Sequence, residues 1–384
     1  MSRLRLYRKI KNITFTLVLL MGLLIPFESI SADHTPPPSL VSESAILIDS
    51  NSGEVLYEKN AHQPMYPASI TKILTAIIAI ETQDLDDVVT VSGNAIRAIG
   101  TRVYLLEDEQ ITIGQLLHGL MVSSGNDAAI AIAEHIDGSV EAFAERMNRF
   151  AQFRMGVSDQ TNFTNPHGLY EDEHIVTAAD MAKISSYAMK NETFRELVGT
   201  HYYDWVGEGW ETRLFNHHPL LRSEENIIGI KNGFVRLSGY TLSTAAKVDD
   251  TELIAVTLQA PSRNYAQRDT LALLRYGFDN FETQWISFEK EPLLVQFVFP
   301  DPIAVTTKKG EEINYSISNS GYVTITGEEN RKIDGFQLKH RELLQLPRFS
   351  LNPVLSATVP IEEQENNHWT DWLVISGFYF FNRN

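Results

Sequence analysis

The hydrophobic period of this chain changes twice, and this pattern limits the folds that the chain can adopt. β-rich runs at 45–48 and 55–57 flank a turn cluster at 49–53, which predicts a hairpin. The period then becomes helical, predicting helices at 69–81, 113–121, 127–136, 139–153 and 177–189. It returns to that of strands, predicted at 227–230, 239–247 and 253–258, before a helix at 268–278. This order predicts an α/β fold in which the outer strands form one antiparallel sheet and the helical block is inserted between them.

The sequence changes character again after residue 285, which indicates a second domain. Short β-like runs separated by Pro, Gly and Asn lie at 293–299, 303–307, 312–317, 322–325 and 354–358. A chain of 384 residues with 43% hydrophobic content is large enough to bury more than one core. We therefore expect one domain over residues 40–284 and a small all-β domain over residues 290–362.

The first 32 residues have the pattern of a secretory signal peptide. Basic residues precede an apolar run at 13–27, and small residues follow it at 29, 31 and 32. A membrane-spanning helix needs about 20 apolar residues, so this run is short for a permanent anchor. We expect export and removal of residues 1–32, with an uncleaved anchor as the alternative.

Residues 367–384 form a second apolar segment, rich in aromatic side chains such as Trp369, Trp372 and Tyr379. The segment is too short to span a bilayer, but Trp and Tyr are enriched at the level of the lipid headgroups. We expect an amphipathic tail that associates with the membrane surface. The alternative is a terminal segment that packs on the β domain.

The composition excludes several functions. The formal net charge is −17, from 49 acidic and 32 basic residues, and this opposes nucleic-acid binding because that requires a basic surface. The chain has no cysteine, so disulfides, thiolate metal sites and cysteine nucleophiles are ruled out. His217 and His218 are adjacent rather than at the spacing of metal ligands, so we expect no metal and no cofactor.

Ser69 and Lys72 form the first of three short motifs, Ser69-Ile70-Thr71-Lys72, at the start of a predicted buried helix. Residues three apart lie on the same face of a helix, so the amine of Lys72 should lie beside the Ser69 hydroxyl. Burial would lower the pKa of the lysine and make the free amine available as a base. By itself the motif is weak, because a helix-capping serine and an exposed lysine give the same pattern.

Two further motifs follow in order along the chain. Ser124-Gly125-Asn126 lies between two predicted helices and is equally consistent with an ordinary turn. Lys231-Asn232-Gly233 ends a predicted strand, where a cation beside a glycine suits an extended peptide that bears a carboxylate. The presence of all three motifs in this order is much stronger evidence for a catalytic site than any one of them alone.

The three motifs together resemble those of the active-site-serine D,D-peptidases, and in particular the low-molecular-mass penicillin-binding D-alanyl-D-alanine carboxypeptidases. The resemblance runs from residue 44 to residue 278 and includes the segments 44–57, 68–76, 119–135, 165–169 and 276–278. Within the family, the chain looks most like the Gram-positive, spore-former type. The resemblance implies a penicillin-binding transpeptidase/β-lactamase-like domain, a small C-terminal all-β domain, and a tail that attaches the exported enzyme to the outer face of the cytoplasmic membrane.

The resemblance also implies roles for the first two motifs. Ser69 would be the acylated nucleophile and Lys72 its general base. Ser124 and Asn126 would assist proton transfer and hold the substrate amide. The implied substrates are the stem pentapeptides of peptidoglycan, which would lose their terminal D-alanine through an acyl-enzyme, and β-lactams would be covalent inhibitors.

For the third motif, the resemblance implies that Lys231 attracts the terminal carboxylate of the substrate. The oxyanion hole would be the backbone N–H groups of Ser69 and Phe234, the residue after Gly233. The family has threonine where this chain has Asn232, and that hydroxyl usually bonds the carboxylate. This departure leaves open a catalytically weakened homologue that binds penicillin or muropeptides. A β-lactamase is another alternative, although segment 162–174 resembles the carboxypeptidases.

Overall fold

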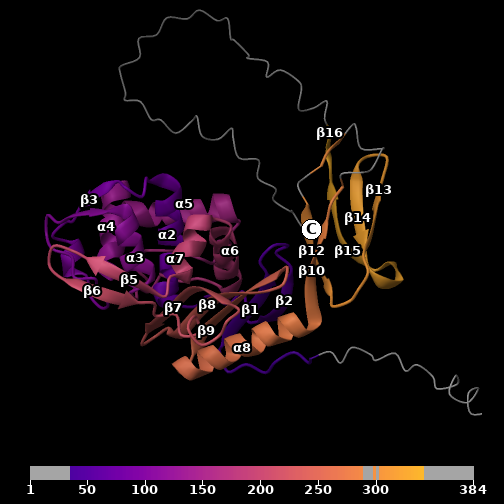
Figure 1. Cartoon of the computed structure of the whole chain (residues 1–384), viewed down its shortest axis with the longest axis horizontal. Helices are drawn as coiled ribbons and strands as arrows, with labels where there is room; N and C mark the ends of the chain where they lie inside the picture. Colours follow the sequence, from indigo (N-terminus) through magenta and orange to yellow (C-terminus); the bar gives the residue numbers. More distant parts are fainter. Residues whose placement is uncertain (1–34, 289–296, 300–301, 341–384) are drawn as a thin grey trace, which may run out of the picture. The chain divides into compact units, whose positions relative to one another are not determined.

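The computed structural model describes residues 35–288, 297–299 and 302–340 (Figure 1). At its centre is an antiparallel five-stranded sheet in the order β2-β1-β9-β8-β7. The strands are β1 (Ser44–Asp49), β2 (Val55–Lys59), β7 (Ile227–Val235), β8 (Gly239–Val248) and β9 (Thr251–Ala260). β1 pairs with β9, so the segments before and after the helical block meet in one sheet. The predicted α/β fold class, with an antiparallel sheet and an inserted helical block, is confirmed.

Alternate residues of the sheet face two different hydrophobic cores, as the two-residue period of a strand requires. Ile46 and Ile48 of β1 belong to the core that the sheet shares with the inserted helices. Ala45 and Leu47 belong to a second core beneath helix α8 (Arg263–Asn280). Figure 1 shows the inserted helices on one side of the sheet and α8 on the other.

Six helices form the inserted block: α2 (Lys72–Thr82), α3 (Ile113–Met121), α4 (Asn126–Asp137), α5 (Val140–Met155), α6 (Ala178–Met189) and α7 (Glu192–Gly199). Several begin at a residue whose side chain accepts a backbone N–H, including Ser139 before α5 and Thr177 before α6. α2 is buried from its first residue through Ala79, which is typical of a helix that other elements surround.

Three differences from the predicted elements have simple physical causes. The hairpin of β5 (Tyr202–Val206) and β6 (Glu211–Phe215) was not predicted, because most of its side chains are exposed and carry no apolar pattern. α8 begins at Arg263 rather than 268, since the Ser262 hydroxyl accepts the Tyr265 N–H and caps it. The third motif lies inside β7 rather than at its end, because pairing with β8 continues to Val235.

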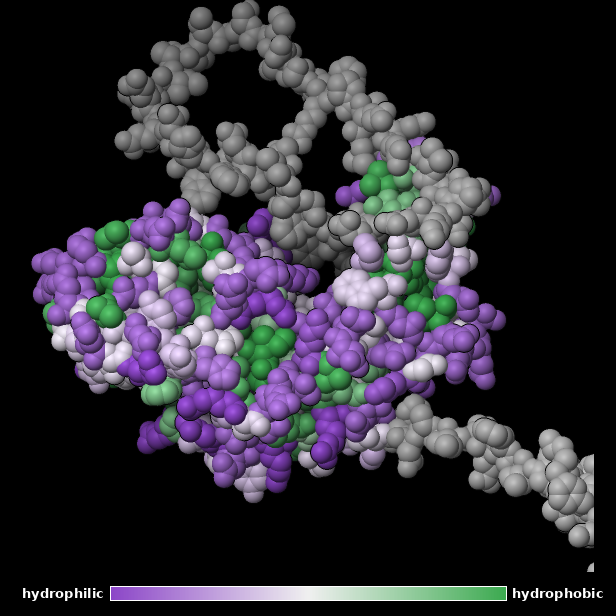
Figure 2. Space-filling view, viewed as in Figure 1, coloured by the Kyte–Doolittle hydropathy of each residue, from purple (hydrophilic) through white to green (hydrophobic). Residues whose placement is uncertain are grey.

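The short hairpin of β3 (Val88–Thr90) and β4 (Gln110–Thr112), and the single turn η2 (Ala95–Arg97), complete this part of the chain. Figure 2 shows that hydrophilic residues cover most of the visible face, as expected for a chain with a large acidic excess. Within the described ranges, no helix combines the length and apolar character that crossing a membrane requires.

The C-terminal part is rich in strands, as predicted. β10 (Phe281–Ile286) pairs with β12 (Ile303–Lys308), and β11 (Phe297–Val298) pairs with β16 (Lys339–His340). β13 (Asn314–Ile317), β14 (Tyr322–Thr326) and β15 (Lys332–Gln337) form a three-stranded sheet, with the turn η4 (Glu328–Asn330) between the last two. The domain boundaries remain predictions. The signal peptide at 1–32, the strand at 354–358 and the tail at 367–384 lie outside the described residues.

Candidate active site

Ser69 lies in the short helix η1 (Ala68–Thr71), which leads directly into α2. The preceding residue, Ala68, has a φ of +52°, and this left-handed conformation turns the chain just before the serine. The Thr241 hydroxyl of β8 donates to the carbonyl of Pro67 at 2.8 Å, which fixes the turn to the sheet. Ser69 is therefore held where the sheet meets the first buried helix.

Lys72 is completely buried, and its amine makes three hydrogen bonds. Nζ donates to Asn126 Oδ1 at 2.6 Å, to the His167 carbonyl at 2.7 Å and to Ser69 Oγ at 3.2 Å. Burial, reinforced by the positive charge of Lys231, holds the pKa of Lys72 well below its usual value, although the charge of Asp127 acts in the opposite direction. A neutral amine at this position can accept the proton of the Ser69 hydroxyl.

The second motif lies between α3 and α4. The side-chain amide of Asn126 has a fixed orientation, because Oδ1 accepts from Lys72 and Nδ2 donates to the Ile99 carbonyl at 2.6 Å. Ser124 is 6% exposed and has a φ of +64°, a conformation that is uncommon for residues other than glycine and asparagine. Strained backbone of this kind is concentrated at functional sites.

Asp127, to which the sequence analysis assigned no role, organises the segment beside the second motif. Its carboxylate is fully buried and accepts the backbone N–H groups of Val103, Tyr104 and Leu105 at 3.0, 2.8 and 3.3 Å. Desolvation raises the pKa of Asp127, while these hydrogen bonds lower it. The carboxylate thereby fixes the segment that supplies the Ile99 carbonyl to Asn126.

A bulge in β7 precedes the third motif. The pairing with β8 shifts between Ile227 and Gly229, and Ile230 has a φ of +113°, which is strained for a β-branched residue. Bulges of this kind redirect side chains next to functional sites. Lys231 follows with 1% exposure, and desolvation lowers its pKa to about 7. Its Nζ donates to the carbonyl and to Oδ1 of Asn232, at 3.2 and 3.4 Å.

Gly233 brings the third motif against the first. A Cβ atom at this position would lie 2.7 Å from the backbone nitrogen of Ser69 and 3.0 Å from the Ala68 Cβ, so only glycine permits the approach. β7 is also an edge strand of the sheet, which leaves one side open to an extended peptide. The backbone at Ser69 is therefore close to the strand that carries Phe234, as an oxyanion hole made from these two N–H groups requires.

The segment 165–169 supplies a contact to Lys72 that no side-chain motif predicts. The Asn165 side chain accepts the backbone N–H groups of His167 and Gly168 at 3.3 and 2.8 Å and so closes a tight turn. Within this turn the Pro166 carbonyl accepts from the Thr75 hydroxyl, and the His167 carbonyl accepts from Lys72, both at 2.7 Å. The segment contributed to the family resemblance, but a backbone carbonyl leaves no signature in a side-chain motif.

The structure therefore joins Ser69, Lys72 and Asn126 by direct hydrogen bonds and packs Gly233 against the first of them. Lys231 influences this group through its charge. In the part of the chain that the structure describes, no group of three or more His, Asp or Glu side chains is arranged to hold a metal ion.

Comparison with known proteins identifies the family. A family model described as D-alanyl-D-alanine carboxypeptidase matches residues 31–262. D-alanyl-D-alanine carboxypeptidase DacF of Bacillus subtilis is 31% identical over 291 residues, which cover 71% of this chain and 74% of that protein. The crystal structure of penicillin binding protein 6B from Escherichia coli has a TM-score of 0.69 and 26% identity, and the match covers 82% of this chain and 98% of that one.

Penicillin binding protein 5 from Haemophilus influenzae gives a TM-score of 0.71 at 26% identity, over 80% of this chain and 98% of that one. These matches confirm the resemblance drawn from the three motifs. Because the family model matches more than half of the sequence, the chain belongs to the D-alanyl-D-alanine carboxypeptidase family of penicillin-binding proteins.

Proposed function

We propose that this protein is a serine-type D-alanyl-D-alanine carboxypeptidase that removes the terminal D-alanine from the stem pentapeptides of peptidoglycan. The observation that carries the proposal is the buried Lys72 amine, 3.2 Å from Ser69 Oγ and with a lowered pKa. The family and the names of its relatives support the same activity.

In the proposed reaction, Ser69 Oγ attacks the carbonyl carbon of the penultimate D-alanine while Lys72 takes the hydroxyl proton. The N–H groups of Ser69 and Phe234 stabilise the negative oxygen that develops. The C–N bond then breaks, the amine of the terminal D-alanine receives a proton, and an ester remains on Ser69. Water hydrolyses the ester and restores the serine. Asn126 holds the substrate amide, Ser124 assists proton transfer, and Lys231 with Asn232 binds the terminal carboxylate.

The proposal is tested by incubating the mature protein with a diacetylated L-lysyl-D-alanyl-D-alanine peptide and measuring released D-alanine. We expect D-alanine release, and covalent labelling by a fluorescent penicillin. Labelling without D-alanine release would favour a catalytically weakened binding protein, and rapid turnover of nitrocefin would favour a β-lactamase. Neither alternative is favoured by the relatives, which are named as carboxypeptidases.

The pH dependence of substrate binding should follow Lys231. Because burial lowers its pKa from 10.5 to about 7, the free protein loses this charge as the pH rises through about 7 rather than near 10.5. Only the charged form attracts a carboxylate, so KM for the peptide should rise up to about tenfold per pH unit above this value. Lys231→Arg keeps its charge and should move this rise to higher pH. A wild-type KM that is constant from about pH 6 to 9 would contradict the assignment.

We also propose that the protein is exported and attaches to the outer face of the cytoplasmic membrane through residues 367–384. Support comes from the basic and apolar pattern of residues 1–32 and from the aromatic side chains of the tail. Removing residues 369–384 should shift most of the mature protein from the membrane pellet to the supernatant after sedimentation, without reducing D-alanine release. A full-length mature protein that does not bind phospholipid vesicles would sink this proposal.

A further inference from the structure

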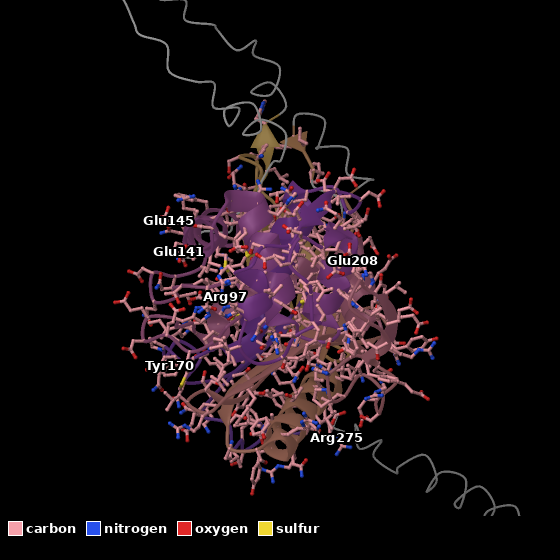
Figure 3. The ribbon with its side chains drawn as sticks, turned by 90° about the vertical axis from the view of Figure 1, so that its left-hand side faces the viewer. Arg97, Glu141, Glu145, Tyr170, Glu208 and Arg275 are labelled. Carbon is pink, nitrogen blue, oxygen red and sulfur yellow. The ribbon has the colours of Figure 1, made fainter. Side chains whose placement is uncertain are left out.

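His174 is a buried histidine that joins the serine-bearing helix η1 to the segment before the 165–169 turn. After this turn the chain reaches the surface at Tyr170 (Figure 3) and returns to the interior at His174, which is 1% exposed. Its Nε2 lies 2.8 Å from the hydroxyl oxygen of Thr71, the last residue of η1. Its Nδ1 accepts the backbone N–H of Thr164 at 3.0 Å. The ring therefore connects two segments that both contact Lys72.

These hydrogen bonds determine which nitrogen of the ring carries the proton. A backbone N–H can only donate, so the Nδ1 atom that faces Thr164 must be the acceptor. The proton of the neutral imidazole is then on Nε2 and is donated to the Thr71 oxygen. Burial, together with the positive charge of Lys72, lowers the pKa of His174 to about 3, so the ring is neutral near pH 7.

The backbone around His174 is held without the help of its ring. Ile175 exchanges two backbone hydrogen bonds with Asn162, at 2.8 and 3.0 Å. Val176 exchanges two with Met65, both at 2.8 Å. A smaller polar side chain at position 174 should therefore leave the local backbone in place, and a changed reaction rate can be assigned to the hydrogen bonds of the ring.

The geometry of η1 leaves little room for movement. The Thr241 hydroxyl fixes the residue before η1, and His174 fixes the last residue of η1. Between these two attachments lies Ser69, whose Oγ is 3.2 Å from Lys72 Nζ, at the long end of the range for such a hydrogen bond. A shift of η1 by about 1 Å would break this bond and could slow the reaction about a hundredfold.

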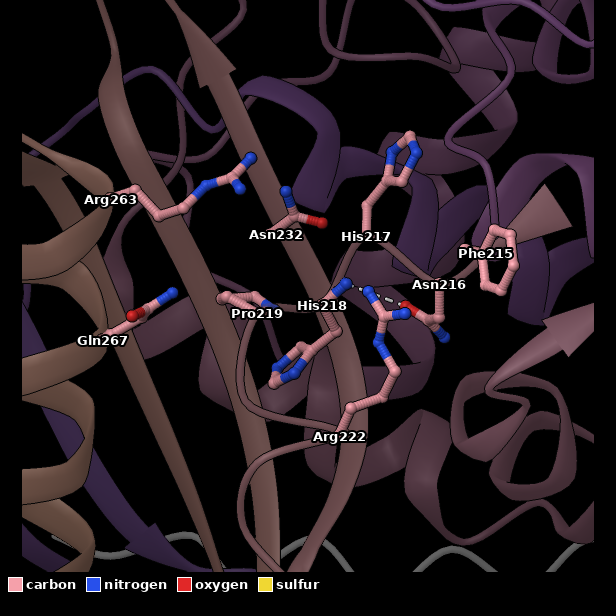
Figure 4. A pocket seen from close by; sticks show the side chains of 9 residues that line it. All are labelled: Phe215, Asn216, His217, His218, Pro219, Arg222, Asn232, Arg263 and Gln267. Atoms are coloured by element: carbon pink, nitrogen blue, oxygen red, sulfur yellow. Dashed lines mark hydrogen bonds between the residues drawn. The ribbon is translucent and has the colours of Figure 1, made fainter.

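A second buried histidine makes the same kind of bond elsewhere in the fold. The Nε2 of His218 lies 3.0 Å from the hydroxyl of Thr244 on β8, and the residue lines a pocket beside Asn232 (Figure 4). A bond between imidazole and threonine is therefore not in itself a sign of catalysis. What distinguishes His174 is that its threonine belongs to the helix that carries the nucleophile.

We propose that His174 is a positioning residue for acylation: its Nε2–H bond to Thr71 holds η1 so that Ser69 Oγ stays within reach of the Lys72 amine. The inference rests on the proposed function for the nucleophile and its base, and it adds a residue that touches neither the substrate nor the reacting atoms. Loss of the bond should slow acylation and leave noncovalent binding unchanged, because the third motif, which holds the substrate carboxylate, lies on β7.

Two substitutions separate the two sides of the ring. The side-chain amide of Gln reaches the position of the imidazole Nε2 and can donate to Thr71, whereas the shorter Asn reaches only that of Nδ1. His174→Asn should slow acylation by benzylpenicillin about thirtyfold, and His174→Gln should stay within about threefold of the wild type. The rates are measured by stopped-flow fluorescence well below the midpoint of thermal unfolding, where a loss of stability alone does not change them. Equal rates for His174→Asn and the wild type, or equally slow Asn and Gln variants, would overturn the inference.

Thr71→Val removes the other end of the same hydrogen bond and completes a double-mutant cycle. This variant should be acylated about as slowly as His174→Asn, and the double variant should be within about threefold of either single variant. Effects that multiply in the double variant would show that the two residues act independently, and the inference would be wrong.

His118→Asn is the matched control, because His118 is a half-buried histidine on α3 that stacks on Tyr203 and donates to the Gly114 carbonyl. It should lower the midpoint of thermal unfolding and keep the wild-type acylation rate. Isothermal titration of diacetyl-L-lysyl-D-alanyl-D-alanine into Ser69→Ala protein, with and without His174→Asn, should give Kd values within about twofold of each other. A Kd that rises as much as the acylation rate falls would contradict a role in positioning the serine.

Penicillin acylation also separates the failure of this inference from the failure of the proposed function. If the wild type is acylated but releases no D-alanine, and His174→Asn is acylated slowly, the proposed function fails and the role of His174 stands. If the wild type releases D-alanine and every position-174 variant is acylated at the wild-type rate, the role of His174 fails alone.

Discussion

Replacing Lys72 by methionine is expected to slow acylation by benzylpenicillin about a thousandfold and to make the protein less stable. The amine lies 3.2 Å from Ser69 Oγ and is the group positioned to take its proton, and general bases contribute about a hundredfold to ten-thousandfold in rate. Methionine has a similar volume but no amine, so it leaves the buried Asn126 Oδ1 and the His167 carbonyl without the hydrogen bonds that Lys72 donates, and each unsatisfied buried acceptor costs about 1–3 kcal/mol. We therefore expect a lower midpoint of thermal unfolding together with the loss of labelling.

The matched control for this variant is Lys183→Met. Lys183 is exposed on α6 and bonds the Gly156 carbonyl at 2.8 Å. Penicillin should acylate the Lys183→Met protein at the wild-type rate, as measured by stopped-flow quenching of protein fluorescence or by gel fluorescence. A folded Lys72→Met protein that is acylated as fast as the wild type would remove Lys72 from the mechanism.

Gly168→Ala is expected to reduce both stability and acylation. Gly168 has a φ of +85°, and a Cβ atom there would lie 1.9 Å from the carbonyl oxygen of Ala68 and 2.8 Å from the hydroxyl of Thr71. Backbone must therefore move at η1, the helix that carries Ser69. We expect a loss of about 2–4 kcal/mol in the free energy of unfolding, from left-handed strain and overpacking. A displacement of about 1 Å at the serine should slow acylation about a hundredfold.

The Gly138→Ala variant separates left-handed backbone strain from overpacking as causes of these losses. Gly138 has a φ of +79° at the end of α4, but no atom lies within 4 Å of the position its Cβ would take. This variant should lose only about 1–2 kcal/mol from backbone strain and keep wild-type acylation. Chemical denaturation and the rate of penicillin labelling check both variants. If the Gly168→Ala and Gly138→Ala proteins were acylated at the same rate and lost the same free energy of unfolding, the contact of Gly168 with η1 would not position the serine.

The sequence predicted the features that depend on local periodicity and on short motifs. The strand-helix-strand order follows from apolar spacing, and it predicted the sheet in which β1 meets β9. Ser69 and Lys72 were predicted as partners because they lie one helical turn apart, and the structure joins them by a hydrogen bond. What brings Asn126 to Lys72 is tertiary packing between α2 and α4, which the sequence indicates only through the family resemblance.

The features that the sequence did not predict depend on backbone groups or on distant residues. The His167 carbonyl reaches Lys72 because Asn165 closes a turn, and a carbonyl has no residue signature. The pocket beside Asn232 brings Arg222 and Arg263 together from two segments on either side of the hairpin of β8 and β9. Each arginine alone resembles an ordinary surface residue, so only the fold reveals the cluster.

The central claim is that Lys72 activates Ser69 as a covalent nucleophile. The most direct test is to treat the mature protein with benzylpenicillin, digest it, and locate the adduct by tandem mass spectrometry. We expect one penicilloyl group per protein, bound to Ser69, and no adduct in folded Ser69→Ala protein. An adduct on another residue, or equal labelling of the Ser69→Ala protein, would contradict it.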